Sequence, residues 1–174
     1  MSTPLLSARR RAADAGRIAE DAERLRLLGE RLRIAVGAAD MGIWDLDLRT
    51  GVNTWDATMC ALYGLTPSTF GGDYAAWRER VHPDDVDTHE AKFRKALADG
   101  CDYDDTFRVV WPDGEERILK ARSIVLKSED GEPVRAIGVN FDVTEQVRRE
   151  RDLIDAHARI RHESLHDPLT CLGN

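Results

Sequence analysis

The stretch GVNFDVT at residues 138–144 joins two different kinds of predicted structure. Before the joint, residues 134–141 are rich in β-branched and apolar side chains and predict a strand. After it, residues 145–164 contain neither glycine nor proline and predict a helix. Asp142 and Glu145 have the spacing of a capping box, in which Asp142 is the N-cap and Glu145 reaches back to it. A helix that continues directly from a strand can transmit a movement of the sheet. This arrangement indicates a role in signalling.

Composition limits the classes of protein to consider. The 174 residues can form one domain with a core plus extensions. A net charge of −7 argues against nucleic-acid binding, because neutralising phosphates requires a basic surface. The three cysteines, Cys60, Cys101 and Cys171, have no C-x-x-C spacing and suggest neither a zinc site nor a disulfide framework.

No targeting or membrane segment is predicted. Residues 1–30 carry too many charges for a signal peptide, and the sequence has no apolar run long enough to span a bilayer. We therefore expect a cytoplasmic protein without a membrane partner.

Residues 8–36 predict a long helix with one apolar stripe. Such a stripe is stable only if it packs on the domain that follows or on a second copy of itself. The stripe consists of Ile18, Ala22, Leu25, Leu28, Leu32, Ala35 and Val36.

The middle of the chain predicts an α+β fold. Residues 42–56 alternate apolar and polar side chains and predict a hairpin, after which Asp56 is placed to cap a short helix. A second short helix is expected around Trp77, and His82-Pro83-Asp84-Asp85 begins the longest internal helix, which Gly100 ends. Strands follow at residues 103–111, 116–127 and 134–141. Strands at both ends with helices between them favour one antiparallel sheet with the helices on one face.

Five short motifs stand in order along residues 34–144: Gly42-Ile43-Trp44-Asp45, Tyr63-Gly64, Val81-His82-Pro83-Asp84-Asp85, Trp111-Pro112-Asp113-Gly114 with Arg117, and Gly138 through Asp142-Val143-Thr144. In this order and spacing, they resemble the motifs of a PAS domain. The resemblance implies a five-stranded antiparallel sheet that cups a small-molecule pocket, in a module for sensing or for protein interaction.

The last nine residues, 166–174, resemble the opening of a GGDEF domain, the module that makes cyclic di-GMP. Family members usually have glycine where Cys171 stands and often proline where Gly173 stands. The loop that binds GTP and metal is not in this chain, so we expect no catalysis from it. The resemblance implies a parent diguanylate cyclase, which could also carry a phosphodiesterase domain. The expected domains are 1–33 (helical extension), 34–144 (PAS), 145–165 (linker helix) and 166–174.

His162 and His166 invite comparison with the phospho-accepting helix of histidine kinases. That family has proline and leucine at a fixed distance after its histidine, and Pro168 stands at the wrong spacing from both. Solvated helix histidines are the simpler interpretation.

His89 is the one polar residue on the apolar stripe of the long internal helix, so we expect it to face the pocket. In haem-binding PAS domains a histidine on this helix holds the iron, and neutral imidazole is a suitable ligand. The alternative is a hydrogen-bonded core histidine. Cys60 lacks the sequence setting of flavin photoreceptors and is expected to be a small core residue. No cofactor is assigned.

Strand alternation places Ala136, Gly138 and Asn140 in the cup. By resemblance, Asn140 stands where flavin photoreceptors have a pocket-facing glutamine, and its amide could bind a ligand or neighbouring backbone. Trp44 and Met59 are the other predicted pocket residues.

The opposite face of the same strand presents Ile137, Val139 and Phe141, which the N-terminal helix of the same or a second copy is expected to cover. The exit helix has a thinner stripe. We therefore expect a homodimer built on the N-terminal helix and the outer sheet face. The exit stripe consists of Val147, Leu153, Ile154, Ala156 and Ile160.

These patterns favour a sensor in which a bound small molecule or a partner shifts the sheet, and Asp142, Thr144 and Glu145 relay the shift to a cyclic di-GMP output domain. One alternative is a ligand-free dimerisation module, and another is a haem-type redox or gas sensor. An open pocket favours the sensor, whereas a core packed solid around Trp44 and His89 favours the ligand-free module.

Overall fold

The computed structural model describes residues 3–165, and the surroundings of the side chains from residue 15 to residue 161. The predicted GGDEF opening at residues 166–174 therefore lies outside the described residues, as does the side chain of His162. The chain divides into two compact units, Met1–Asp40 and Met41–Asn174.

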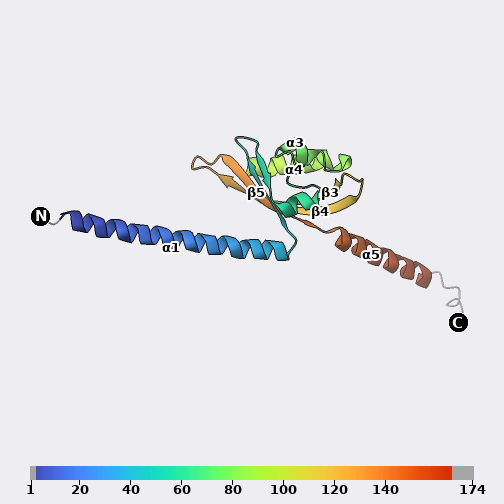
Figure 1. Cartoon of the computed structure of the whole chain (residues 1–174). Helices are drawn as coiled ribbons and strands as arrows, with labels where there is room; N and C mark the ends of the chain where they lie inside the picture. The colour runs from blue at the N-terminus through green and yellow to red at the C-terminus, as the bar shows by residue number, and fades with distance from the viewer. Residues whose placement is uncertain (1–2, 166–174) are drawn as a thin grey trace. The chain divides into compact units, whose positions relative to one another are not determined.

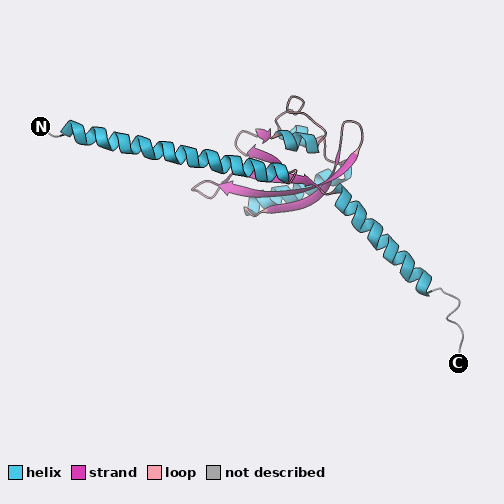
Figure 2. Ribbon diagram, turned by 60° about the horizontal axis from the view of Figure 1, so that its bottom comes forward, coloured by secondary structure: helices cyan, strands magenta, loops and turns pink. Residues whose placement is uncertain are grey.

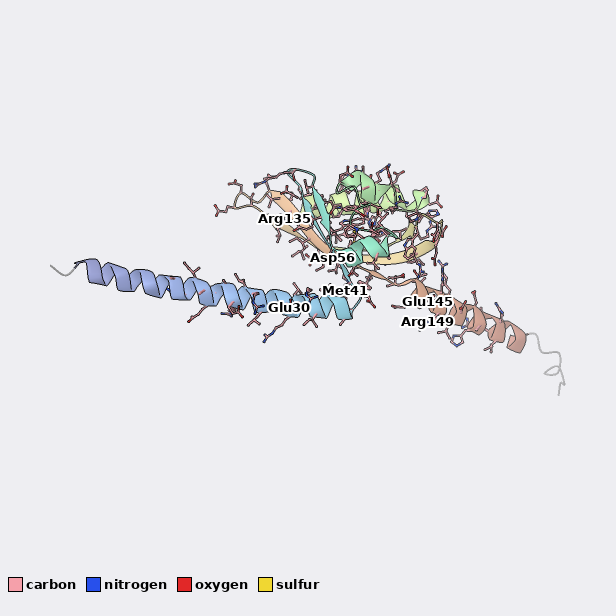
Figure 3. All side chains as sticks on the ribbon, viewed as in Figure 1. Glu30, Met41, Asp56, Arg135, Glu145 and Arg149 are labelled. Carbon is pink, nitrogen blue, oxygen red and sulfur yellow. The ribbon has the colours of Figure 1, made fainter. Side chains whose placement is uncertain are left out.

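The first unit is a single helix, α1 (Thr3–Ala38), which is longer at both ends than the predicted range. Ion pairs one turn apart, Glu23 with Arg26 and Glu30 with Arg33, stabilise its polar surface (Figure 3). The stripe leucines Leu25, Leu28 and Leu32 are 50–69% exposed in the single chain. The helix by itself therefore leaves its apolar stripe exposed.

The second unit is built on one five-stranded antiparallel sheet with the strand order β2-β1-β5-β4-β3 (Figure 2). The first and last strands of the unit, β1 and β5, are neighbours in the sheet. Their pairing therefore joins the two ends of the domain's sequence. This is the α+β PAS fold that the sequence predicts. The strands are β1 (Gly42–Asp47), β2 (Asn53–Trp55), β3 (Tyr103–Val110), β4 (Glu116–Lys127) and β5 (Pro133–Asp142).

The connecting helices lie over one face of the sheet, where α3 and α4 form the upper layer in Figure 1. The predicted caps are present: the Asp56 carboxylate accepts from the Met59 N–H at 2.7 Å, and Gly100 ends its helix in the left-handed conformation. The helices are α2 (Ala57–Leu62), α3 (Tyr74–Arg78), α4 (Pro83–Asp99) and α5 (Thr144–Leu165). Among the described helices, none is long and apolar enough to cross a membrane.

Strand β5 alternates as predicted. Ala136, Gly138 and Asn140 face the core, whereas Ile137 and Val139 are only partly buried on the outer face.

Gly138 allows close packing at the centre of the sheet. A Cβ atom at Gly138 would lie 2.5 Å from the Trp44 ring and 2.5 Å from the Arg122 carbonyl oxygen. The glycine therefore lets the Trp44 indole pack directly against the backbone of β5.

The junction of β5 and α5 differs from the predicted capping box. The strand continues through Asp142 and the helix begins at Thr144, so Val143 occupies the N-cap position. Asp142 still accepts a hydrogen bond from the first turn, at 2.7 Å from the Thr144 N–H. The Glu145 carboxylate pairs with Arg148 at 3.4 Å instead of reaching back to Asp142. The capping-box prediction is wrong because the β5 ladder holds Asp142 as far as its pair with Leu119.

Candidate functional site

A cavity of about 40 Å³ lies between the inner face of the sheet and the helices. The four residues predicted to line a pocket, Trp44, Met59, His89 and Asn140, all border it. They come from β1, α2, α4 and β5, so the fold brings together residues far apart in the sequence. The core is neither wide open nor packed solid.

Asn140 is the centre of one buried hydrogen-bond network. The Trp44 indole N–H donates to Asn140 Oδ1 at 3.0 Å, and Asn140 Nδ2 donates to the Tyr63 hydroxyl at 2.9 Å. The Trp77 side chain also hydrogen-bonds Tyr63, whose pKa is raised by burial so that its hydroxyl stays neutral. Asn140 is thus bonded to side chains of two other elements and not to neighbouring backbone.

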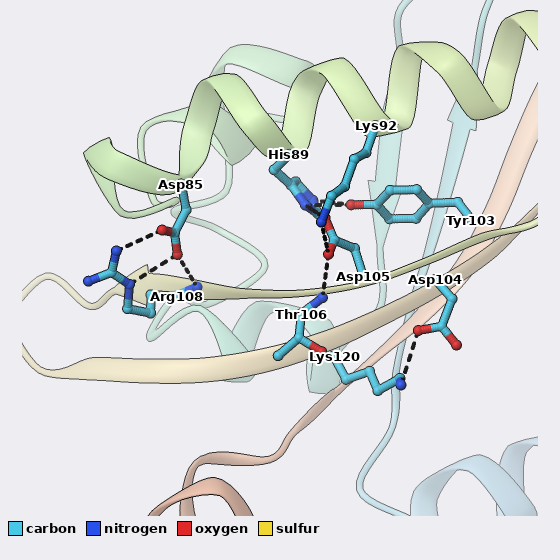
Figure 4. Close-up of polar contacts among 9 residues, drawn as sticks. All are labelled: Asp85, His89, Lys92, Tyr103, Asp104, Asp105, Thr106, Arg108 and Lys120. Carbon is cyan, nitrogen blue, oxygen red and sulfur yellow. Dashed lines mark hydrogen bonds and ion pairs between the residues drawn. The ribbon is translucent and has the colours of Figure 1, made fainter.

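His89 belongs to a second network on the other side of the cavity, which Figure 4 shows between α4 and β3. His89 Nδ1 lies 3.0 Å from Asp105 Oδ2, and the Tyr103 hydroxyl lies close to both ring nitrogens, 2.5 Å from Nδ1 and 2.6 Å from Nε2. Lys92 pairs with the other oxygen of Asp105 at 2.7 Å.

Burial lowers the pKa of His89, and the neighbouring Asp105 opposes this only in part. The ring is therefore neutral. A neutral ring with Nδ1–H donating to Asp105 and Nε2 accepting from the Tyr103 O–H satisfies both contacts.

This arrangement does not fit a haem. Both ring nitrogens of His89 already have protein partners, so neither is available to iron. The cavity of about 40 Å³ is also far smaller than the several hundred Å³ of a site for a large ligand. The hydrogen-bonded core histidine is the interpretation that agrees with the geometry.

Two further polar side chains, Asn53 and Trp55 of β2, line the cavity and were not predicted as site residues. Asn53 Oδ1 and Trp55 Nε1 are buried and lack a hydrogen-bond partner in the described structure. The sequence did contain one indication of a site, which is an asparagine, Asn53, at an inward-facing position of a strand. Without the β1–β2 register this signal does not lead to a cavity.

Cys60 has the expected role. It is 1% exposed in the core beside Met59, and burial raises the pKa of its thiol. A protonated, enclosed thiol is inert.

The exit junction binds the first turn of α5 to β4. Thr144 is 1% exposed, and its hydroxyl accepts from the Ile118 N–H at 2.8 Å. The Val143 N–H donates to the Ile118 carbonyl at 2.9 Å. Asp142 Oδ2 also receives Arg117 at 3.4 Å. Val143 and Thr144 are therefore both tied to the Ile118 backbone, which fixes the start of α5 on β4.

Glu145 lies on the surface of α5 next to Arg149, as Figure 3 shows. Arg149 Nε donates to the Glu145 carbonyl at 3.1 Å. Of the three predicted relay residues, Asp142 and Thr144 contact each other directly at the junction, whereas the Glu145 side chain does not take part in it.

Comparison with known proteins agrees with this architecture. A family profile described as PAS fold matches residues 52–140. The chain is 30% identical over 147 residues to a probable diguanylate cyclase, DgcE, of Escherichia coli, covering 83% of this chain and 13% of that protein. It is 26% identical over 133 residues to the sensor protein FixL of Bradyrhizobium diazoefficiens, covering 76% of this chain and 26% of that protein. The chain thus spans about an eighth and a quarter of these relatives.

Among solved structures, a sensory box histidine kinase/response regulator from Burkholderia thailandensis superposes with a TM-score of 0.66 at 28% identity. The match covers 76% of this chain and 98% of that chain. The relatives are sensor and signalling proteins, and the shared part is the sheet with its covering helices.

Proposed function

Because the chain belongs to the PAS-fold family, we propose that it is the sensory module of a larger signalling protein. A small molecule in the cavity, or a partner protein, would shift the sheet, and α5 would carry the shift to an output domain. The PAS fold is sensory and not catalytic, so the chemistry belongs to that output domain.

The observation that carries this proposal is the continuity between cavity and exit. Asn140 is bonded to Trp44 and Tyr63 at the cavity, and Asp142, two residues further on β5, accepts from the first N–H of α5. A strand transmits a displacement along its length because its covalent backbone is already nearly fully extended. A change at Asn140 therefore reaches Thr144 through a single short piece of backbone.

We propose a diguanylate cyclase as the output. The similarity to a probable diguanylate cyclase and the resemblance of residues 166–174 to a GGDEF opening support this assignment. The proposed domain limits are 1–33, 34–144, 145–165 and 166–174. We place the module in the cytoplasm, where a GTP-consuming output domain finds its substrate.

The proposal includes a homodimer. Apolar side chains on α1, on the outer sheet face and on α5 are exposed in the single chain, including Leu25, Ile124 and Leu153 at 69%, 49% and 62%. Burial of such side chains contributes about 1.5–3 kcal/mol each. A second copy is the partner that offers complementary apolar stripes of equal length.

A ligand-free dimerisation module is the second candidate. The observation in its favour is the small cavity, which at about 40 Å³ admits only a small ligand. In that case α5 would only set the spacing of two output domains.

Thr144 provides the test of the relay. In the full-length parent protein, Thr144→Val removes the hydroxyl that accepts from Ile118 and keeps the shape of the side chain. We expect the variant to lose most of the regulation of cyclic di-GMP synthesis, because allosteric couplings of about 1–3 kcal/mol are comparable to one hydrogen bond. Thr144→Ser keeps the hydroxyl and is the matched control. Normal regulation in a folded Thr144→Val protein contradicts the relay.

A further inference from the structure

The geometry points to a ligand for the cavity: we propose that it binds a small uncharged molecule that carries a hydrogen-bond donor and an acceptor, such as a short amide or alcohol, anchored by Asn53 and Trp55. This inference rests on the proposed sensory function and names the class of molecule that is sensed.

The two anchor atoms are complementary. Asn53 and Trp55 both line the cavity, and the acceptor Asn53 Oδ1 and the donor Trp55 Nε1 are buried without a hydrogen-bond partner in the described structure. Residues two apart on a strand face the same side, and both side chains are buried, with Asn53 at 6% and Trp55 at 8% exposure. Buried polar atoms are almost always hydrogen-bonded, so an orphan acceptor and donor in one cavity indicate a bound polar group.

Two other polar side chains at the cavity are already engaged. Asn140 binds Trp44 and Tyr63, and His89 binds Asp105 and Tyr103. Of the four orphan side-chain atoms in the described residues, those of Arg117 and Ser123 do not border the cavity. Among the cavity-lining residues, the fully buried polar atoms left without a partner are therefore one acceptor and one donor, both from β2.

The charge of the lining excludes an ion. Besides the tyrosines, its only ionisable group is His89, which burial keeps neutral. Asp105, behind it, is already paired with Lys92. A charged ligand would lose its hydration without gaining an opposite charge, which is strongly unfavourable.

The size limits the ligand further. A cavity of about 40 Å³ holds about three waters, or a molecule of about four non-hydrogen atoms. Its walls include the rings of Trp44, Phe93 and Phe107, which suit a short carbon skeleton.

Trp55 also connects this ligand to the exit strand. Its indole stacks on Phe70 at 3.8 Å between ring centroids and contacts Tyr63 at 4.6 Å. The Tyr63 hydroxyl accepts from Asn140 on β5. A ligand that accepts a hydrogen bond from the Trp55 N–H would therefore touch a residue that directly contacts Tyr63, and Tyr63 is bonded to Asn140 on the strand that leads to α5.

The test uses the indole N–H resonances of the 174-residue chain in ¹⁵N-edited NMR spectra, with Trp55→Phe to assign the Trp55 signal. Four small probes form two matched pairs: acetamide against acetate, which differ in charge, and propan-2-ol against acetone, which differ in the donor. We expect a saturable shift of the Trp55 resonance with acetamide and propan-2-ol. Acetate and acetone should bind about tenfold more weakly or not at all.

Two variants localise the effect. Asn53→Leu removes the acceptor at similar volume and should weaken acetamide binding about tenfold. Ser123→Ala removes an orphan hydroxyl that does not border the cavity and should leave binding unchanged. If Asn53→Leu does not fold, the wild-type comparison of acetamide with acetate decides alone.

Equal affinity for acetamide and acetate overturns the proposal. It is also overturned if none of the four probes gives a saturable shift, which would mean that the cavity holds water only. Either result leaves the Thr144 test of the relay unaffected. Conversely, binding at Trp55 together with unchanged regulation in Thr144→Val would support the ligand class and contradict the relay.

Discussion

His89 is neutral in the core because burial penalises the imidazolium more than the neighbouring carboxylate stabilises it. Asp105, which could have stabilised the charged form, is itself neutralised by Lys92 at 2.7 Å. Trp77 and Phe107 contribute ring faces on the remaining sides, at 5.4 and 3.9 Å between centroids. At the scale of the residue, the buried surroundings of His89 therefore keep its ring neutral.

The lowered pKa of His89 makes stability depend on pH. Below 6.5, the value for a free histidine, the unfolded chain binds a proton that folded His89 resists. The free energy of unfolding should consequently decrease as the pH falls from 6.5 through the folded-state pKa. His89→Gln removes this titration, so its pH dependence should be flatter than that of the wild type. Urea unfolding at a series of pH values measures both.

His157→Gln is the matched control for that experiment, because His157 is exposed on α5. It should retain the wild-type pH dependence. A His89→Gln protein whose stability falls with pH as steeply as the wild type would show that His89 is not the responsible group.

At the scale of the element, the important feature is where β5 ends and α5 begins. The ladder to β4 extends to the pair of Asp142 with Leu119, and Ile118 continues it through Val143 and Thr144. The helix α5 thus continues directly from the central strand β5 and does not begin with a cap of its own. This placement explains why Asp142 contacts the N–H of the first helical residue and no later one.

Asp142→Ala should destabilise this junction by about 1 kcal/mol, the usual net value of one hydrogen bond, and leave the PAS fold intact. The loss should appear as faster amide hydrogen exchange at Thr144 and in the first turn of α5. Asp142→Asn keeps the acceptor oxygen and should exchange at the wild-type rate. Equal protection in Asp142→Ala and the wild type would show that the Val143 and Thr144 contacts with Ile118 suffice.

At the scale of the whole molecule, the exposed apolar stripes of α1, the outer sheet face and α5 remain to be covered. Ion pairs on α1 such as that of Glu30 with Arg33 are exposed and contribute little, usually at most about 1 kcal/mol each. The half-exposed Leu28 on this 36-residue helix supports the proposed association with a second copy.

Sedimentation of the chain at micromolar concentration should show a dimer. Leu28→Glu on the stripe should shift it to monomer, because a charge would be buried in the interface. Ile34→Glu is the matched control, since Ile34 is also exposed but lies on the side of α1 opposite the stripe. A wild-type chain that stays monomeric at about tenfold higher concentration contradicts the homodimer, because association follows mass action.

The sequence alone determined the α+β fold, the inward face of β5 and the ends of several helices. Alternation along Ala136, Gly138 and Asn140, the cap at Asp56 and the stop at Gly100 are all local patterns. These patterns depend on backbone geometry that repeats within a few residues, so they can be recognised without knowing which distant residues they contact.

Only the tertiary structure decided the chemistry of the site. Trp44 and Asn140 are 96 residues apart in sequence, and the pairing of β1 with β5 brings them to 3.0 Å. The pairing of β1 with β2 turns Asn53 and Trp55 into cavity residues, and the pairing of β4 with β5 holds Asp142 in the ladder instead of at a helix cap. Hydrogen bonds between residues so far apart in the sequence depend on strand register and on packing. A local sequence pattern carries no information about either.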